Sequence, residues 1–402
     1  MDATVEQLGG VVLDALRAAG YLESTVGQYE KTIRYLKGFA ADRGEVVYVP
    51  SLGAEFAAMT ISPRTGRFSA ARRFDYRRLV TLFDGVLDTG VVDLSVRRRG
   101  GGGTRPVSSE FTALDAAWEG DMDARGLALA TRAAYGRVAR GYLVFLESRG
   151  VSGLDAADGA SVLAFLESLS GRWAASSLFW VVSNFRPFLR FTGRTELVEA
   201  VGLAGVKRSH RILPVLEDAD QARVVHACTS EMVTARDAAI TLLALSTGLR
   251  ACDIVGLRLR DIDWRAGTIG IIQQKTSNPL TLPLASLVTA KLADYVLAER
   301  PDSREDHVFL RCKAPHTKLA DHASIYRVIA ATFRVAGVSD LKVGTSVLRH
   351  SAASRLLRAG VPLPTISAVL GHASPESTNV YLSVDQERLL ECVLPVPAGA
   401  RA

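Results

Sequence analysis

One stretch late in the chain, LGHASPESTNVY at residues 370–381, decides the fold. Gly371 suits the left-handed position that ends a helix, and the hydroxyl of Ser374 can cap a following helix whose first position is a proline. The pattern predicts a helix, a tight turn that carries His372, and a short second helix that carries Tyr381. A tyrosine in such a position is commonly a core or interface residue, so its meaning depends on what accompanies it.

A second segment, LSTGLRACD at residues 245–253, places an arginine directly after an apolar helix. The helix is expected to end at Gly248, and Arg250 follows at once, with Asp253 placed to orient it. When the segment is considered alone, a surface ion pair between this arginine and this aspartate is the ordinary explanation.

Two further segments carry a lysine and an arginine in defined local settings. Residues 268–284 contain an isoleucine-rich run, a turn with asparagine and proline, and an alternating run, which predict a β-hairpin with Lys275 close to its tip. In SVLRH, residues 346–350, Arg349 lies at the start of a helix that runs to Gly360. Exposed lysines are common on hairpins, so Lys275 considered alone does not indicate a function.

Taken together, these segments resemble the catalytic domain of the tyrosine recombinases, the phage integrase family, over about residues 212–385. That family has an arginine after a Thr-Gly-Leu turn, a hairpin lysine, a His-x-x-Arg helix, a Leu-Gly-His turn and a tyrosine nine residues after the last histidine. The matching positions of this chain, in the same order, are Arg250, Lys275, Arg349, His372 and Tyr381.

These residue types fit a reaction at a phosphate group. Charge builds on the non-bridging oxygens when a hydroxyl attacks phosphorus, and Arg250 and Arg349 could grip these oxygens bidentately while keeping their own charge. A tyrosine hydroxyl has an ordinary pKa of about 10, so nearby positive charge, and His372 as a proton acceptor, would help Tyr381 to ionise. The resemblance implies that Lys275 protonates the departing 5′ oxygen and that the product is a 3′-phosphotyrosyl link. Because that link keeps the energy of the broken bond, we expect neither a cofactor nor a metal site.

One position departs from the family pattern. The histidine expected three residues before Arg349 is Ser346. A hydroxyl can donate a hydrogen bond to a phosphate oxygen, but it carries no charge and cannot buffer a proton near neutral pH. His350 is adjacent in sequence, but one helical step turns it about 100° away from Arg349, so we do not expect it to substitute.

The first half of the chain contains an internal repeat with a constant offset of 106 residues, which predicts a duplicated helical domain. In each copy the threonine is expected to cap a helix, the aromatic residues to lie on one helix face, and the last glycine to end the helix. The identical pairs are Gly20 and Gly126, Thr25 and Thr131, Tyr29 and Tyr135, Arg34 and Arg140, Phe39 and Phe145, Arg43 and Arg149, and Gly44 and Gly150.

The predicted fold is mainly α-helical with a small β-hairpin or sheet. Residues 1–95 and 110–205 are predicted to be helical, SAM-like DNA-binding domains, and residues 214–402 an α+β catalytic domain with a C-terminal tail. The resemblance implies that the second helical domain is the family's core-binding domain. The first could bind flanking arm-type DNA or extend the grip on the duplex, and its similarity to the second favours the grip.

Two linkers separate these domains. Residues 96–109 are rich in arginine and glycine, and four consecutive glycines stabilise neither a helix nor a strand. Residues 206–213 form a basic linker, in which Lys207, Arg208 and Arg211 are expected to bind DNA phosphates.

Composition places the chain among ordinary globular proteins. It has 402 residues, of which 48% are hydrophobic and 22% charged, and its net charge of +6 is compatible with a polyanionic partner. Residues 64–105 alone hold ten arginines and four aspartates. No apolar run could span a membrane and no secretory signal is visible, so we expect no membrane contact and a cytoplasmic location. The four scattered cysteines form no CxxC pair, so neither a disulfide framework nor a zinc site is expected.

These observations predict site-specific DNA recombination, as by an integrase, transposase or resolvase of a mobile element. The expected partners are double-stranded DNA with specific recombination sites and further copies of the chain in a tetramer, and accessory recombinases or DNA-bending proteins could assist. Two alternatives stay open. One is a DNA-binding protein of the same fold without strand exchange, which Ser346 favours, and the other is a relaxing enzyme similar to type IB topoisomerases, which would act as a monomer.

Overall fold

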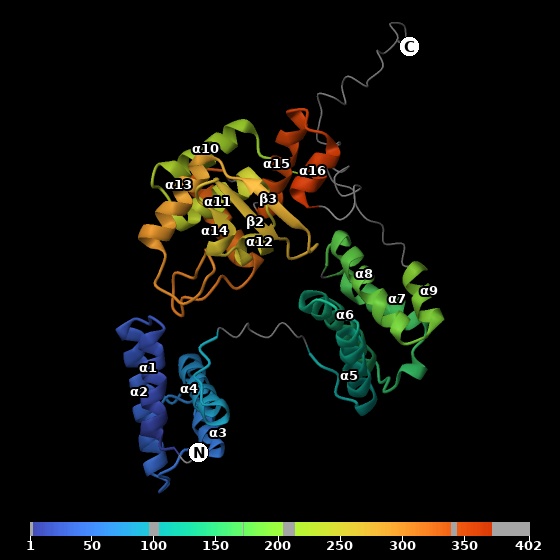
Figure 1. Ribbon diagram of the computed structural model, residues 1–402. Helices are drawn as coiled ribbons and strands as arrows, with labels where there is room; N and C mark the ends of the chain where they lie inside the picture. Colours follow the sequence, from blue (N-terminus) through green and yellow to red (C-terminus); the bar gives the residue numbers. More distant parts are fainter. Residues whose placement is uncertain (1–2, 96–103, 172, 204–213, 339–343, 372–402) are drawn as a thin grey trace. The chain divides into compact units, whose positions relative to one another are not determined.

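The computed structural model (Figure 1) describes most of the chain, namely residues 3–95, 104–171, 173–203, 214–338 and 344–371. Residues 96–211 form one compact unit, and residues 1–95 together with 212–402 form the other. Within the described ranges helices dominate and the named strands form a single small sheet, which confirms the predicted fold class. None of the described helices is both long and apolar enough to cross a membrane.

Residues 3–95, the first helical segment, enclose one hydrophobic core. Its helices are α1 (Val5–Ala18), α2 (Glu23–Ala41), α3 (Pro50–Ala58) and α4 (Ala70–Thr89). Apolar residues at helical spacing, such as Leu36 on α2 and Leu79 and Phe83 on α4, are fully buried. The helices are therefore stabilised mainly by the face that each one buries.

Residues 104–203, the second helical segment, enclose a separate core that is rich in aromatic residues. Its helices are α5 (Ser109–Ala124), α6 (Leu129–Ser148), α7 (Gly159–Ser170), α8 (Ala175–Phe191) and α9 (Thr195–Leu203), with a 3-10 turn at Leu154–Ala156. Trp118, Tyr142, Phe185 and Phe188 are fully buried, and their rings pack edge to face or stacked.

The sequence repeat corresponds to a repeat of helices. Helices α1 and α2 match α5 and α6 at the offset of 106 residues, and the expected left-handed glycines are present in both copies. Gly44 and Gly150, with φ of 71° and 77°, follow α2 and α6, and Gly20 and Gly126, with φ of 78° and 63°, follow α1 and α5. The same glycine chemistry thus ends equivalent helices in the two segments.

The expectation that Thr25 and Thr131 cap their helices is wrong. Helix α2 begins at Glu23 and α6 at Leu129, so each threonine is the third residue of its helix. The capping positions are occupied by Leu22 and Ala128, which have no side-chain acceptor, and neither helix has a side-chain cap. Each helix begins three residues earlier than it would with the threonine as its cap. Burial of the apolar face outweighs the loss of about 1 kcal/mol for a missing cap.

The C-terminal segment, residues 214–371, contains the sheet and several helices. The helices are α10 (Asp218–Thr229), α11 (Ala235–Thr247), α12 (Ala251–Gly256), α13 (Ser286–Asp294), α14 (His322–Val335), α15 (Thr345–Arg358) and α16 (Leu363–Leu370), with a 3-10 turn at Leu259–Asp261 and a π-turn at Tyr295–Glu299. Helix α11 is the centre of this core: nine of its residues are buried. It packs against α10, α13, α14 and α15.

The sheet has three antiparallel strands in the order β1 (Ile262–Asp263), β2 (Thr268–Ile272) and β3 (Pro279–Pro283). The predicted hairpin is confirmed: β2 pairs with β3, and Lys275 lies exposed in the turn between them. Strand β1 is too short for its alternation to be visible in the sequence. The hairpin places its tip beside the end of α16, where the residues of the candidate site meet.

Candidate active site

Arg250 lies in the short connection between α11 and α12, two residues after the left-handed Gly248 that ends α11. Its Nη2 donates to the carbonyl oxygen of Gly371 at 2.8 Å, and its Nη1 donates to Oε1 of Gln273 at 3.3 Å. Both partners are neutral oxygen acceptors. The guanidinium is therefore oriented without an ion pair among the described residues.

Arg349 lies on α15 and is only 8% exposed. Its Nη1 donates to the carbonyl oxygen of Gly248 at 2.9 Å, and its Nη2 donates to the carbonyl oxygen of Leu370 at 2.7 Å. The two arginines thus bind neighbouring carbonyls, those of Leu370 and Gly371, although Arg250 precedes Gly371 by 121 residues. The helix end predicted at Gly371 is confirmed, with φ of 63°.

Gln273 joins these groups and was missed by the sequence analysis. It is fully buried at the end of β2. Its Oε1 accepts from Arg250 and from Oγ1 of Thr276, the latter at 2.8 Å, while its Nε2 donates to the carbonyl oxygen of Leu370 at 3.2 Å. A signal was available, because residues 269, 271 and 273 alternate toward the core and the last of them is polar.

The side-chain amide of Gln273 packs directly against Gly371. A Cβ at position 371 would lie 1.7 Å from Oε1 of Gln273, and the backbone there is left-handed. A side chain would displace Gln273 and would also be strained. The turn after α16 is therefore packed against the hairpin, which carries Lys275.

Asp253 does not orient Arg250, contrary to expectation. Its Oδ1 accepts a hydrogen bond from the backbone amide of Gln274 at 2.8 Å, and no ion pair with Arg250 forms. The carboxylate is 3% exposed, and its Oδ2 has no hydrogen-bond partner in the described part of the chain. The hydrogen-bond donor to Asp253 is thus the backbone amide of Gln274, the residue before Lys275, and not the guanidinium of Arg250. Asp253 therefore fixes the start of the turn that carries Lys275.

Ser346 is exposed near the beginning of α15, one turn before Arg349. His350 does not replace the missing histidine, because burial, and then the charge of Arg349, lower its pKa to about 4. A neutral imidazole at physiological pH supplies no positive charge to a phosphate.

Five predicted site residues lie outside the described residues: His372, Tyr381, Lys207, Arg208 and Arg211. The structure therefore brings together Arg250 and Arg349 and places Lys275 on the adjoining hairpin, and the described residues stop directly before His372. The assembled part is suited to bind an anion, since two guanidinium groups are fixed at one turn by hydrogen bonds.

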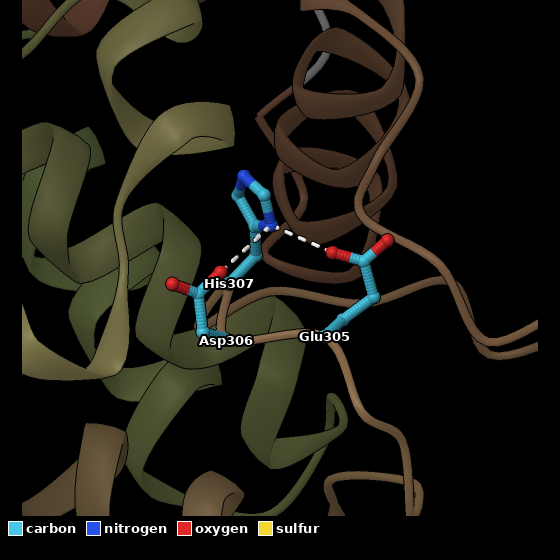
Figure 2. A group of neighbouring side chains, drawn as sticks. All are labelled: Glu305, Asp306 and His307. Atoms are coloured by element: carbon cyan, nitrogen blue, oxygen red, sulfur yellow. Dashed lines mark hydrogen bonds and ion pairs between the residues drawn. The ribbon is translucent and has the colours of Figure 1, made fainter.

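A second group of potential ligand atoms lies elsewhere in the C-terminal segment. Figure 2 shows that the carboxylates of Glu305 and Asp306 approach the same ring nitrogen, Nδ1 of His307, at 2.9 and 3.6 Å. Asp306 also pairs with Arg258 at 2.5 Å, and the hydrogen bond from that arginine lowers the pKa of Asp306. These side chains already bind one another, and the backbone of Asp306 bonds to Leu259, so the group braces a loop.

Comparisons with known proteins address the family. The model of the phage integrase family matches residues 214–388. The provisionally named integrase/recombinase y4rF of Sinorhizobium fredii is 33% identical over 225 residues, which cover 54% of this chain and 53% of that protein. This chain therefore spans about half the length of that relative.

Two other proteins match over longer stretches. The tyrosine recombinase XerC of Nitrobacter winogradskyi is 30% identical over 290 residues, which cover 66% of this chain and 87% of XerC. The crystal structure of the site-specific recombinase XerH, bound to its palindromic difH substrate, is similar with a TM-score of 0.56 and 15% identity, over 85% of this chain and 92% of XerH. At that identity the structural likeness speaks for the fold alone.

Proposed function

The chain belongs to the tyrosine recombinase family, also called the phage integrase family, and we propose that it breaks and rejoins DNA at specific sites through a covalent link to Tyr381. One observation supports this most directly. Arg250 and Arg349, far apart in sequence, bind the adjacent carbonyls of Gly371 and Leu370, directly before the segment that carries His372 and Tyr381.

In the proposed first step the Tyr381 hydroxyl attacks a backbone phosphate in line with the 5′ oxygen. The bond from tyrosine oxygen to phosphorus forms as the bond from phosphorus to the 5′ oxygen breaks. Arg250 and Arg349 stabilise charge on the non-bridging oxygens, His372 takes part as a hydrogen-bond donor or proton acceptor, and Lys275 protonates the departing oxygen. The electron pair of the broken bond leaves with that oxygen.

The second step reverses the first with a different strand. A free 5′ hydroxyl attacks the 3′-phosphotyrosyl link, and the tyrosine oxygen leaves. The number of phosphoester bonds is conserved, so neither step needs a nucleotide. Exchange between two duplexes involves four strands and each chain supplies one Tyr381, so the proposed assembly is a tetramer on specific double-stranded sites. Accessory recombinases or DNA-bending proteins could join it.

Ser346 supports a second candidate function, DNA binding in the same fold without strand exchange. Its hydroxyl can donate a hydrogen bond but brings no charge, and the neighbouring His350 is held neutral at physiological pH. A relaxing enzyme similar to type IB topoisomerases would use the same chemistry, but as a monomer on one duplex.

The test uses a nicked suicide duplex that carries the recombination site of the chain, taken under this proposal to be the end sequence of its mobile element. We expect the wild-type chain to form a covalent protein–DNA adduct, Tyr381→Phe to form none, and Arg250→Gln to react at least about 100-fold more slowly, because one charged oxyanion partner is lost. Arg265→Gln is the matched control, since Arg265 is exposed and outside the site.

Two outcomes would count against the proposal. Tight binding of the duplex without an adduct would support the binding-only function, and an adduct that persists in Tyr381→Phe would remove the assigned nucleophile. Strand exchange between two sites, compared with relaxation of a supercoiled plasmid, separates a recombinase from a topoisomerase.

A further inference from the structure

Residues 60–80 of the first helical segment hold six arginines but a single acidic residue, Asp75. No step of the proposed reaction uses them. They are divided between a small hairpin ahead of α4 and the first half of α4 itself. The local excess of positive charge is far above the average for this chain.

Backbone hydrogen bonds define the hairpin ahead of α4. Ile61 pairs with Phe68 in an antiparallel bridge, and the amide of Ser62 donates to the carbonyl of Arg67 at 2.9 Å. The tip turns at the left-handed Gly66, with φ of 66°, and presents Arg64 beside it. The positions of Arg64 and Arg67 are therefore set by backbone hydrogen bonds.

Helix α4 is joined to this hairpin by two of its arginines. Arg72 donates from Nη1 to the carbonyl of Ile61 at 3.3 Å, and the guanidinium of Arg73 lies 5.2 Å from the centre of the Phe68 ring. Arg77 follows Arg73 by four residues and so lies on the same helix face. The hairpin and the start of α4 are thus joined by contacts, and we call their exposed arginines, Arg64, Arg67, Arg73 and Arg77, the arginine surface.

The four side chains of the arginine surface are exposed, and none forms an ion pair with a described carboxylate. Asp75 is two residues from both Arg73 and Arg77, about 200° around the helix, and its Oδ2 accepts from Gln28 on α2. The arginine surface is therefore not neutralised by its one acidic neighbour.

Three other cations of the same segment form ion pairs, whereas Lys31 and Arg34 on α2 are exposed without an ion pair to a described carboxylate. Arg17 pairs with Asp14, Glu23 and Glu30, Lys37 with Glu6, and Arg43 with Glu55. In addition, Arg72 and Arg73 lie in the first turn of α4, where the helix dipole disfavours positive charge and no acidic residue is present. This local concentration of positive charge is mildly unfavourable for folding, and an anionic partner would offset it.

We infer that the arginine surface binds the phosphate backbone of a DNA duplex, so that the first helical segment is itself a sequence-independent DNA contact. Guanidinium groups fit phosphate oxygens geometrically and keep their charge at any physiological pH. The choice of DNA among polyanions rests on the proposed function, which brings duplex DNA to this chain. Contacts to phosphates position a protein on a duplex without reading its sequence.

The test measures binding of the full chain to a mixed-sequence duplex of about 60 base pairs between about 50 and 200 mM salt. The variant Arg64→Gln/Arg67→Gln/Arg73→Gln removes three charges of the arginine surface. If each charge neutralises one phosphate, the slope of log affinity against log salt becomes shallower by about 3, since each contact contributes about 0.9.

A matched control removes three charges that are already paired: Arg17→Gln/Lys37→Gln/Arg43→Gln. It changes the net charge equally, and we expect its slope to change by less than about 1. The triple Arg→Lys variant at positions 64, 67 and 73 keeps the charge and should keep the wild-type slope. Unchanged slope in the arginine-surface variant, or an equal change in both triple Gln variants, would overturn the inference.

Adduct formation on the suicide duplex separates this inference from the proposed function. At saturating protein the arginine-surface variant should still form the adduct, because its substitutions lie outside the site. An adduct with unchanged salt slope refutes only the arginine surface. A changed slope without any adduct in the wild type refutes only the proposed reaction.

Discussion

The two helical segments place the same arginine in opposite environments. Arg140 on α6 is 7% exposed, and its Nη1 lies 3.4 Å from Asp115 and 2.9 Å from Glu119. Its counterpart Arg34 on α2 is exposed. The difference originates in the preceding helix, because the positions equivalent to the two carboxylates are glycine and leucine in the first segment. A residue that is identical in both copies of a repeat can therefore lie in two different environments.

The outer surfaces of the segments differ as well. The first segment presents the arginine surface around the start of α4. The second presents Trp173 and Trp180, stacked at 6.3 Å between ring centres, at the edge of a cavity of about 320 Å³. One scaffold of matching helices thus carries a charged surface in one copy and an aromatic one in the other.

The largest expected effect tests the buried arginine. Arg140→Met should destabilise the second segment by about 3 kcal/mol, because Asp115 stays buried without its cation. Arg34→Met, the matched control, should cost less than about 0.5 kcal/mol at its exposed position. Hydrogen exchange resolved by peptide reports each segment separately, through α5 and α6 or through α1 and α2. Equal losses of protection in the two variants would contradict the comparison.

The pH dependence of the same variant sharpens this test. Burial raises the pKa of Asp115, so the folded segment takes up a proton more readily than the unfolded chain does. Its stabilising contribution is present below the ordinary pKa of the carboxyl and is lost as the pH rises through the raised value. Arg140→Met raises that pKa further, so its destabilisation should be smaller at pH of about 4 than at about 7. A loss that is independent of pH would exclude Asp115 as the cause.

A smaller effect is expected at a pair of equivalent glycines. A Cβ on Gly53 would lie 2.1 Å from the hydroxyl of Tyr48, which donates to Asp84 at 2.8 Å, whereas a Cβ on Gly159 would lie 3.2 Å from the Cβ of Ala200. Gly53→Ala should therefore cost about 2 kcal/mol, and Gly159→Ala should stay within about 1 kcal/mol of the wild type. The comparison fails if thermal unfolding ranks the two in the reverse order.

The smallest effect concerns a contact that both copies share. Arg43 lies 3.5 Å from the centre of the Phe39 ring and Arg149 lies 5.0 Å from that of Phe145. Arg43→Gln should cost up to about 1 kcal/mol and Arg149→Gln about 0.5 kcal/mol, since such contacts are weak at exposed sites. Thermal unfolding of each single variant measures this. A larger loss for Arg149→Gln would show that ring distance does not rank the two contacts.

Features with a local cause could be predicted from the sequence. The left-handed glycines at positions 248 and 371 and the hairpin turn at Lys275 depend on residues that are close together in the chain. The roles assigned to His372 and Tyr381 also rest on local spacing, and they stay predictions. For the same reason the family pattern could be found in one sequence.

Features with distant causes could not be predicted. Asp253 bonds to an amide 21 residues away, which no spacing rule connects to it, and Gln273 bonds to a carbonyl 97 residues away. The threonines at positions 25 and 131 failed as caps because the start of each helix is set by tertiary burial. The partners of Arg140 likewise depend on how α5 packs against α6.

The turn at Leu370 and Gly371 has a consequence for the order in which the protein is made. A growing chain emerges from its amino end, and early segments fold first. Arg250 is synthesised 121 residues before the carbonyl that orients it, and Arg349 is synthesised 21 residues before its own. A ribosome-bound chain that stops short of this turn would already contain both arginines and the arginine surface, yet it could not fix the arginines at one point. Under the proposed function, nascent chains could touch DNA before they could cut it.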